Sequence, residues 1–523
     1  MNTIFKVDGK PFFPLGGQSS NSASYAKEEL KVFFEALKDM NGNTGEVPIY
    51  WERLEPVEGQ FDFTIVDNVI LMAREYKVKL ILLWFGSWKN GLMSYVPGWV
   101  KTDKNRFKRV ISHDGHVVNV LSSSCEENLN ADRKAFCAMM EHILKVDSSE
   151  KTVISVQVQN EAGIIGRSIR DHGPEAEKEF NSPVPNEITA KLPNAKTSIV
   201  GDIWRIAGAK KEGSWSELFG KDASELFNTW SLAKYIDAIA EAGKNVYNLP
   251  MYTNVWLDRK RWSKPGVDYP SGGPIPKVLD IWMWTVHALN LIAPDIYEAV
   301  SHDFRFYCNA YKRDDNPLFV PESDGRRGLN NDIYMFYALG QYQAIGYFAF
   351  GIEHSILPDG TRNQQLIEIY ESFRAASSVI PLLIKLNGSG NVHSVVQEPY
   401  MEWQLIHADQ YDILVDFSII RADTIHHSPH YTKQRGRGLI LQAGPSEFYV
   451  LGGGFSTAFR PKNHTVDYAD HDPANYRNYL CVEEGRFDEN DNWICSRVRS
   501  GDESQNGIWV HTDVGAVKVI IAD

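Results

Sequence analysis

The feature of this sequence that most constrains its fold is a repeated alternation of short apolar runs with longer segments of helical periodicity, which extends to about residue 385. Several of the runs are apolar on both faces, as is typical of strands in a parallel sheet that helices cover on both sides. Eight runs are candidate strands, at residues 12–17, 45–51, 80–86, 153–159, 250–256, 292–297, 318–321 and 346–351.

The segments between these runs place apolar residues on one helical stripe. The pattern is clear in residues 28–40, 131–146 and 229–245. Strand–helix alternation repeated eight times predicts a (β/α)8 barrel. The alternative is an open, doubly wound sheet. However, the first run ends Leu-Gly-Gly-Gln at residues 15–18, which is not the Gly-rich turn typical of open sheets that bind nucleotides.

The pattern changes after Asn-Gly-Ser-Gly-Asn at 387–391, which we interpret as a linker or a tight turn. Six short alternating runs then follow, at residues 402–407, 411–417, 438–442, 447–451, 508–511 and 517–521. Turn residues separate them, which is typical of an all-β sandwich. We therefore predict a (β/α)8 catalytic barrel at 1–386 and a C-terminal β-sandwich domain at 387–523. Within the barrel, the polar stretch 167–220 is predicted to form a long loop over the top.

The amino-acid composition argues against several classes of binding partner and site. The net charge of −13 argues against a nucleic acid or an anionic membrane surface, because both favour a basic face. The five cysteines are odd in number and none has CxxC spacing, so we expect neither a disulfide framework nor a structural zinc site. No signal-peptide pattern and no membrane-length apolar run is found, which favours a cytoplasmic protein. The 14 tryptophans could supply faces that suit sugar rings.

Two carboxylates follow predicted strands at positions where a barrel carries its active site. Asn160 and Glu161 end the fourth strand, and Glu322 ends the seventh. A pair of facing carboxyl groups suits hydrolysis of a glycosidic bond, with one acting as a proton donor and the other as a nucleophile or base. If the reaction retains configuration, the two groups should lie about 5–5.5 Å apart.

Longer segments resemble a known family. VPIYWERLEPVEGQFDF (47–63), QVQNEAG (157–163), LIAPDIY (291–297), LFVPES (318–323) and EFYVLGGGF (447–455) resemble the bacterial branch of glycoside hydrolase family 35, β-galactosidases with an added C-terminal β domain. The β-galactosidases of family 42 are more distant relatives, which share chiefly the Glu-Pro-x-x-Gly-x-Phe-Asp-Phe pattern at 55–63.

The resemblance implies roles for four residues. Glu161 would be the acid/base and Glu322 the nucleophile of a retaining reaction that needs no metal or cofactor. Asn160 would bind the sugar 2-hydroxyl, and Tyr297 would hold the carboxylate of the nucleophile. Further candidate substrate contacts lie at or just beyond strand ends, where tryptophans could equally be packing residues: Trp51, Glu52, Trp84, Trp88, Asn90, Asn254 and Trp256.

These observations predict an exo-acting retaining β-galactosidase that acts on oligosaccharides. The Cys-Ala-Glu-like segment that animal-type family 35 members carry after strand three is replaced here by Trp-Phe-Gly-Ser-Trp at 84–88. The sugar could therefore be another β-linked one, such as arabinopyranose, fucose, xylose or glucose. A third alternative is a carbohydrate-binding protein without activity. The C-terminal domain could bind polysaccharide, or it could serve packing or homo-oligomer formation.

Overall fold

The computed structural model describes residues 4–258, 262–326, 330–417, 435–462, 479–499, 501–504 and 507–522. Within them the predicted (β/α)8 barrel is confirmed. Eight parallel strands pair in the order β11-β10-β9-β8-β5-β4-β3-β12. Bridges from Val320 to Tyr347 and from Asp324 to Phe350 bring the last two strands together. The strands are β3 (Leu15–Gln18), β4 (Thr44–Tyr50), β5 (Lys79–Lys89), β8 (Val153–Asn160), β9 (Met251–Trp256), β10 (Leu291–Ile296), β11 (Glu322–Ser323) and β12 (Tyr347–Phe350).

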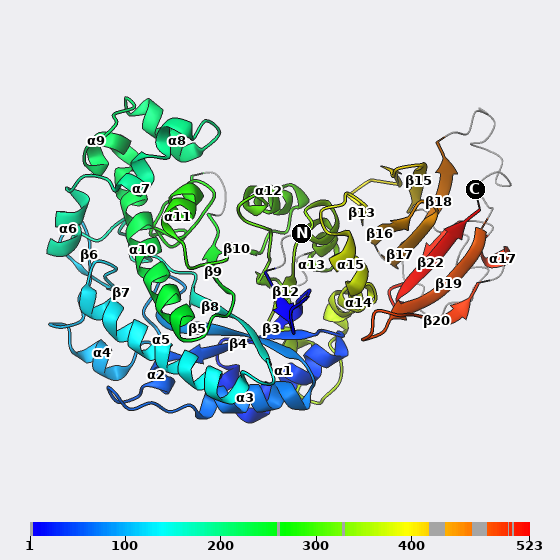
Figure 1. Cartoon of the computed structure of the whole chain (residues 1–523), viewed down its shortest axis with the longest axis horizontal. Coiled ribbons are helices and arrows are strands. Elements are labelled where there is room, and N and C mark those ends of the chain that lie inside the picture. The colour runs from blue at the N-terminus through cyan, green and yellow to red at the C-terminus, as the bar shows by residue number, and fades with distance from the viewer. Residues whose placement is uncertain are drawn as a thin grey trace.

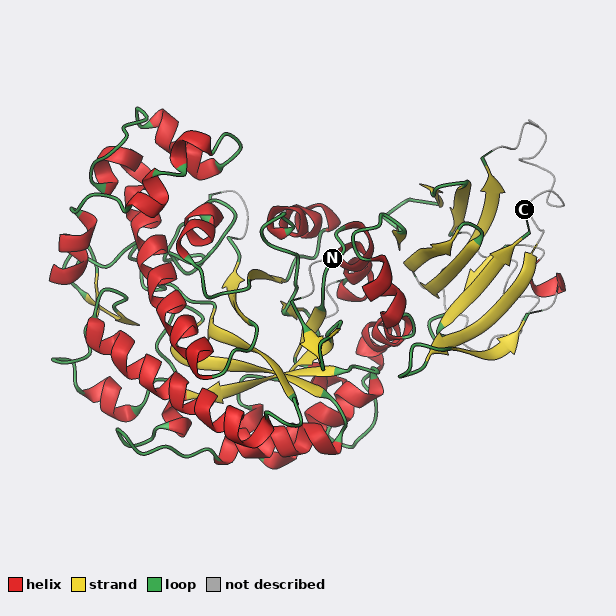
Figure 2. Cartoon of the chain, viewed as in Figure 1, coloured by secondary structure: helices red, strands yellow, loops and turns green. Residues whose placement is uncertain are grey.

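The barrel strands bury both of their faces. One face forms a cluster inside the barrel that includes Ile81, Leu83, Tyr252, Leu291 and Ala293. The opposite face packs against the surrounding helices (Figures 1 and 2). The main helices are α1 (Lys27–Asp39), α3 (Thr64–Glu75), α5 (Glu126–Asp147), α10 (Ala223–Val246), α12 (Ser301–Tyr311), α13 (Asn331–Phe336), α14 (Ile367–Ser377) and α15 (Ile380–Leu386).

Residues 167–220 differ from the predicted loop, because they contain four short helices (Figure 1). These are α6 (Pro174–Phe180), α7 (Asn186–Thr189), α8 (Ile199–Ile206) and α9 (Trp215–Phe219). Widely spaced apolar residues from these helices, such as Ile188 and Trp215, are fully buried. Each helix is too short to give a clear periodic signal in the sequence, since a periodic pattern needs a window of about 11–18 residues.

The C-terminal part forms two antiparallel sheets, as predicted from its alternating pattern (Figure 2). Ten strands are present among the described residues, of which the sequence patterns had indicated six. The six-stranded sheet contains β13 (Val392–Val396), β16 (Arg437–Gly444), β17 (Glu447–Gly453), β22 (Ala516–Ile521), β19 (Tyr479–Phe487) and β20 (Trp493–Val498). The four-stranded sheet contains β14 (Trp403–His407), β15 (Tyr411–Asp416), β18 (Phe455–Pro461) and β21 (Ile508–Val510). A separate apolar cluster fills the space between the sheets.

The C-terminal sheets contact the barrel through α13, α14 and α15. Arg437 of β16 is completely buried there, and its guanidinium lies 3.6 Å from Asp332 and donates to the Ser372 hydroxyl at 2.8 Å. No helix in the described ranges has both the length and the apolar character that a membrane crossing requires.

Candidate active site

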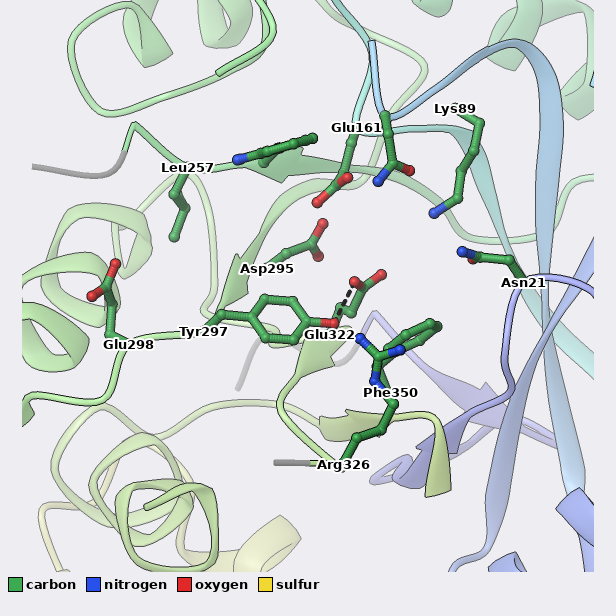
Figure 3. Close-up of a pocket in the computed structure, with 12 residues that line it drawn as sticks. Asn21, Lys89, Glu161, Leu257, Asp295, Tyr297, Glu298, Glu322, Arg326 and Phe350 are labelled. Atoms are coloured by element: carbon green, nitrogen blue, oxygen red, sulfur yellow. Dashed lines mark hydrogen bonds between the residues drawn. The ribbon is translucent and has the colours of Figure 1, made fainter. Parts of the chain in front are cut away.

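A pocket of about 270 Å³ opens at the carboxyl ends of the barrel strands (Figure 3). Three acidic side chains meet in it, one from each of three strand ends. Glu161 directly follows β8, Asp295 lies near the end of β10, and Glu322 begins β11. The remaining lining residues are Asn21, Lys89, Asn90, Trp256, Leu257, Tyr297, Glu298, Arg326 and Phe350.

The three carboxyl groups are close together and nearly buried. One oxygen of each lies within 4.8 Å of the other two. Glu161 and Glu322 are each 6% exposed, and Asp295 is 3% exposed. In Figure 3, Asp295 lies between Glu161 and Glu322. Glu161 and Glu322 were predicted from the sequence as a pair. The carboxyl group of Asp295, at the centre of the pocket, was not predicted.

Glu322 accepts hydrogen bonds on both of its oxygens. The Tyr297 hydroxyl donates to Oε1 at 2.6 Å, and the Gln18 amide donates to Oε2 at 3.0 Å. Donors of this kind stabilise the charged form of a carboxyl group and fix its orientation. Burial, followed by the negative charge of Glu322, raises the pKa of the Tyr297 hydroxyl well above its usual value. Tyr297 therefore stays a donor, and the two hydrogen bonds fix the orientation of the Glu322 carboxyl group.

Asn254 links Asp295 to the backbone of Glu161. Its Oδ1 accepts from the Glu161 backbone N–H at 2.8 Å, and its Nδ2 donates to Asp295 Oδ2 at 2.7 Å. Burial raises the pKa of Asp295 well above the usual range, and the negative charges of Glu322 and Glu161 raise it further. Glu322 and Asp295 therefore differ in environment, because Glu322 accepts hydrogen bonds from two donors and Asp295 accepts one.

Lys89 is a second polar group that the sequence analysis did not select. It ends β5, is 6% exposed, and donates through Nζ to Asn160 Oδ1. Its ammonium group also lies 4.8 Å from the centre of the Phe85 ring. The contact fixes the orientation of the Asn160 amide, whose Nδ2 is buried with no acceptor among the described residues. Trp88 and Asn90 were candidate sugar contacts in the sequence, whereas Lys89, which lies between them, was not.

Of the tryptophans that were candidates for either sugar stacking or packing, three pack in the core between the strands and the helices. Trp51, Trp84 and Trp88 are at most 1% exposed. Trp51 donates to Glu55, Trp84 donates to Asp132, and Trp88 packs edge-on against Tyr235. None of the three lines the pocket. Trp84 shares its strand face with Leu80 and Leu82, which pack toward the helices, so its indole points away from the pocket.

The other predicted contacts divide between the pocket and its surroundings. Asn90 and Trp256 line the pocket, and Asn254 supports it through the two hydrogen bonds described above. Glu52 does not line it, because its carboxylate is held by the Tyr25 hydroxyl at 2.7 Å and by Lys101 at 3.3 Å. Asn160 does not line the pocket and is fully buried.

The carboxyl triad is the one group of Asp, Glu, His or Cys side chains in the described ranges whose ligand atoms lie close enough to surround a cation. Three of its six oxygens already accept hydrogen bonds, from Tyr297, Gln18 and Asn254. Metal-binding carboxylates direct their oxygens at the ion. At this site, donors from the protein itself hold half of the carboxyl oxygens in place.

Comparisons with known proteins agree with this chemistry. Residues 22–198 match the family model Glyco_hydro_42, described as beta-galactosidase, and this segment includes Asn160 and Glu161. Residues 369–511 match a domain of unknown function, DUF5597. Among curated proteins no relative matches the chain. The predicted resemblance to family 35 is not supported by these findings, whereas a related (β/α)8 glycosidase is.

Solved structures share the fold at low sequence identity. The beta-galactosidase from Bacillus circulans sp. alkalophilus is 13% identical over 72% of this chain, with a TM-score of 0.50. The catalytic domain of beta-amylase from Paenibacillus polymyxa is 10% identical over 69% of this chain and 97% of its own, also with a TM-score of 0.50. The chain spans 57% of the length of the Bacillus circulans protein. These structures show the fold of the barrel, and the family model matches its first half.

Proposed function

We propose that the protein is an exo-acting retaining β-galactosidase that releases terminal β-galactose from oligosaccharides. The observation that carries the proposal is that one carboxyl oxygen of Glu161 lies within 4.8 Å of one carboxyl oxygen of Glu322, at the mouth of a barrel. Retaining glycosidases hold their two carboxyl groups about 5–5.5 Å apart, whereas inverting enzymes separate them by about 6.5–9.5 Å to admit a water molecule.

In the proposed reaction Glu322 attacks the anomeric carbon while the bond from that carbon to the leaving oxygen breaks. Glu161 gives its proton to the leaving oxygen, and a covalent glycosyl ester on Glu322 results. Water then attacks the anomeric carbon, Glu161 takes a proton from it, and the bond to Glu322 breaks. Both carboxyl groups return to their starting states, and the sugar keeps its β configuration.

The size of the pocket supports exo action. Its volume of about 270 Å³ lies just below the roughly 300–1,000 Å³ of pockets for drug-sized ligands. A pocket of this size suits one terminal sugar unit better than the interior of a polymer. All of its lining residues lie before residue 387. We therefore propose that catalysis belongs to the barrel at 1–386, with residues 387–523 as a separate domain.

The choice of galactose rests on the description of the family model that matches residues 22–198. The matched segment stops before Tyr297 and Glu322, which line the same pocket. The other β-linked sugars therefore enter the test as competitors.

The test is hydrolysis of 4-nitrophenyl β-galactopyranoside by the wild type, Glu322→Gln and Glu161→Gln, alongside a panel of other 4-nitrophenyl β-glycosides. We expect Glu322→Gln to lose several orders of magnitude in kcat. We expect azide to restore turnover to Glu161→Gln, because a small anion can replace water where the general base is missing. Glu127→Gln, an exposed glutamate paired with Arg106, is the matched control and should behave as the wild type.

Each other outcome changes the proposal. A wild type that hydrolyses a different β-glycoside and ignores the galactoside would keep the mechanism and replace the sugar. A wild type that binds galactose but hydrolyses no member of the panel would favour a carbohydrate-binding protein. Full activity in Glu322→Gln would contradict the assigned nucleophile.

A further inference from the structure

Asp295 has no part in the proposed double displacement, yet it lies at the centre of the pocket. It is 3% exposed and lies between Glu161 and Glu322, with an oxygen within 4.8 Å of an oxygen of each (Figure 3). A buried carboxyl group beside two others is costly as an anion, because like charges repel strongly where water is excluded. Its position therefore calls for a physical explanation.

The hydrogen bonds around Asp295 identify which of its oxygens can carry a proton. The Oδ1 atom of Asn254 accepts from the Glu161 backbone N–H, so the Nδ2 atom of Asn254 must face Asp295 as a donor. Asp295 Oδ2 receives that donor at 2.7 Å and is an acceptor. Asp295 Oδ1 is buried, and no N–H or O–H group of the described residues donates to it. The Glu161 carboxyl group is within hydrogen-bonding reach of Asp295.

Most of the charged and titratable groups around Asp295 raise its pKa. Burial raises its pKa, as do the charges of Glu322 from β11 and Glu161 from β8, and the positive charge of Lys89 of β5 opposes them. Three tyrosines also face the Asp295 carboxyl group: Tyr297, two residues further along the chain, Tyr252 of β9 and Tyr311 of α12. Burial raises the pKa of each of their hydroxyls. Glu46 of β4 adds a further buried carboxyl group beside Tyr252 and Glu322.

We propose that Asp295 is a positioning residue, held as a neutral carboxylic acid whose Oδ1 hydroxyl donates a hydrogen bond to the carboxyl group of Glu161. This inference rests on the proposed function of Glu161 as the acid/base. The donated bond aims Glu161 and stabilises the carboxylate that Glu161 becomes when its proton passes to the leaving group. When Glu161 later accepts a proton from water, the same bond is still in place, and Asp295 itself neither gains nor loses a proton.

Two substitutions separate this role from that of a charged or a merely structural residue. Asp295→Asn keeps the shape and charge of the neutral acid: its carbonyl can accept from Asn254, and its NH2 group can donate to Glu161. Asp295→Leu has a similar shape but no donor. We expect Asp295→Asn to keep kcat/KM within about tenfold of the wild type with an unmoved pH profile. We expect Asp295→Leu to lose about 10- to 100-fold, as for a hydrogen bond to a charged group.

The pH profile distinguishes positioning from folding. Loss of a donor disfavours the charged form of the acid/base carboxyl group, so the alkaline limb of kcat/KM in Asp295→Leu should move to higher pH. A structural defect alone would lower the activity without moving the limb. If Asp295→Asn instead moves the alkaline limb to lower pH by about one unit or more, Asp295 is an anion in the active enzyme and the proposal is wrong.

A measurement without substrate keeps the proposal testable if no glycoside is hydrolysed or if Asp295→Leu does not fold. Infrared spectroscopy of the full chain at mildly alkaline pH should show a protonated carboxyl C=O band that is lost in Asp295→Asn. Asp332→Asn, which removes a buried acid beside Arg437 with a pKa raised by burial to about 6, should leave that band in place. A spectrum of Asp295→Asn that matches the wild type would overturn the proposal, whatever the substrate proves to be.

Discussion

The contact between Lys89 and Asn160 gives a prediction whose size follows from the structure. Replacing Lys89 with Met keeps most of the buried volume but removes the donor to Asn160 Oδ1. A hydrogen bond to a charged group contributes about 1.5–3 kcal/mol. Because about 1.36 kcal/mol corresponds to tenfold in rate, we expect kcat/KM to fall by about 10- to 150-fold. The fall should appear on any glycoside that offers a 2-hydroxyl to Asn160.

The assay compares Lys89→Met on 4-nitrophenyl β-galactopyranoside and on its 2-deoxy counterpart. The Nδ2 group of Asn160 is buried with no acceptor among the described residues, and we expect it to donate to the 2-hydroxyl once a sugar is bound. The variant should therefore lose much more on the parent glycoside than on the 2-deoxy compound, which already lacks that contact. Lys151→Met, at a half-exposed surface pair with Asp8, is the matched control and should leave kcat/KM unchanged. Equal losses on both substrates would refute the argument that Lys89 acts through Asn160.

Two further predictions concern Glu322 and the core. Tyr297→Phe removes the 2.6 Å donor to Glu322 and should lower kcat/KM by about 10- to 150-fold. Because that donor stabilises the charged form of the carboxyl group, its loss should move the acidic limb of the pH profile to higher pH; an unmoved limb would contradict this role. Trp51→Ala should lower the free energy of unfolding by about 3–5 kcal/mol with KM little changed, because Trp51 is buried outside the pocket; a large rise in KM with unchanged thermal stability would place it at the sugar instead.

Much of the barrel could be predicted because its strands and helices differ in period. Seven of the eight apolar runs overlap a strand, and the run at 318–321 ends just before β11 (Glu322–Ser323). Of the C-terminal strands, β13, β18, β19 and β20 were not predicted. In β20, five of the six residues are exposed, so the strand shows little alternation between apolar and polar residues. Such edge strands are fixed by pairing with a neighbour, and that pairing is not visible in a local pattern.

The polar residues of the site were predictable where a strand ends on a characteristic pair, as at Asn160 and Glu161. Whether an aromatic residue lies in the pocket or in the core was not predictable. Both faces of a barrel strand are apolar, so the sequence does not show which face points inward. Asp295 could have been found by alternation. It follows Leu291 and Ala293, which point into the barrel, and precedes Tyr297, so all four lie on one strand face. Lys89 lies beyond an irregularity in the register of β5, where simple alternation fails.

The central claim is that Glu161 and Glu322 carry out a double displacement. The most direct measurement is proton NMR of the first sugar released from an aryl β-glycoside that the enzyme hydrolyses, recorded before the anomers equilibrate. The account predicts that the β-anomer appears first and the α-anomer grows in later, because two successive inversions at the anomeric carbon restore its configuration. Release of the α-anomer first would mean a single displacement by water, and Glu322 could then not be the nucleophile.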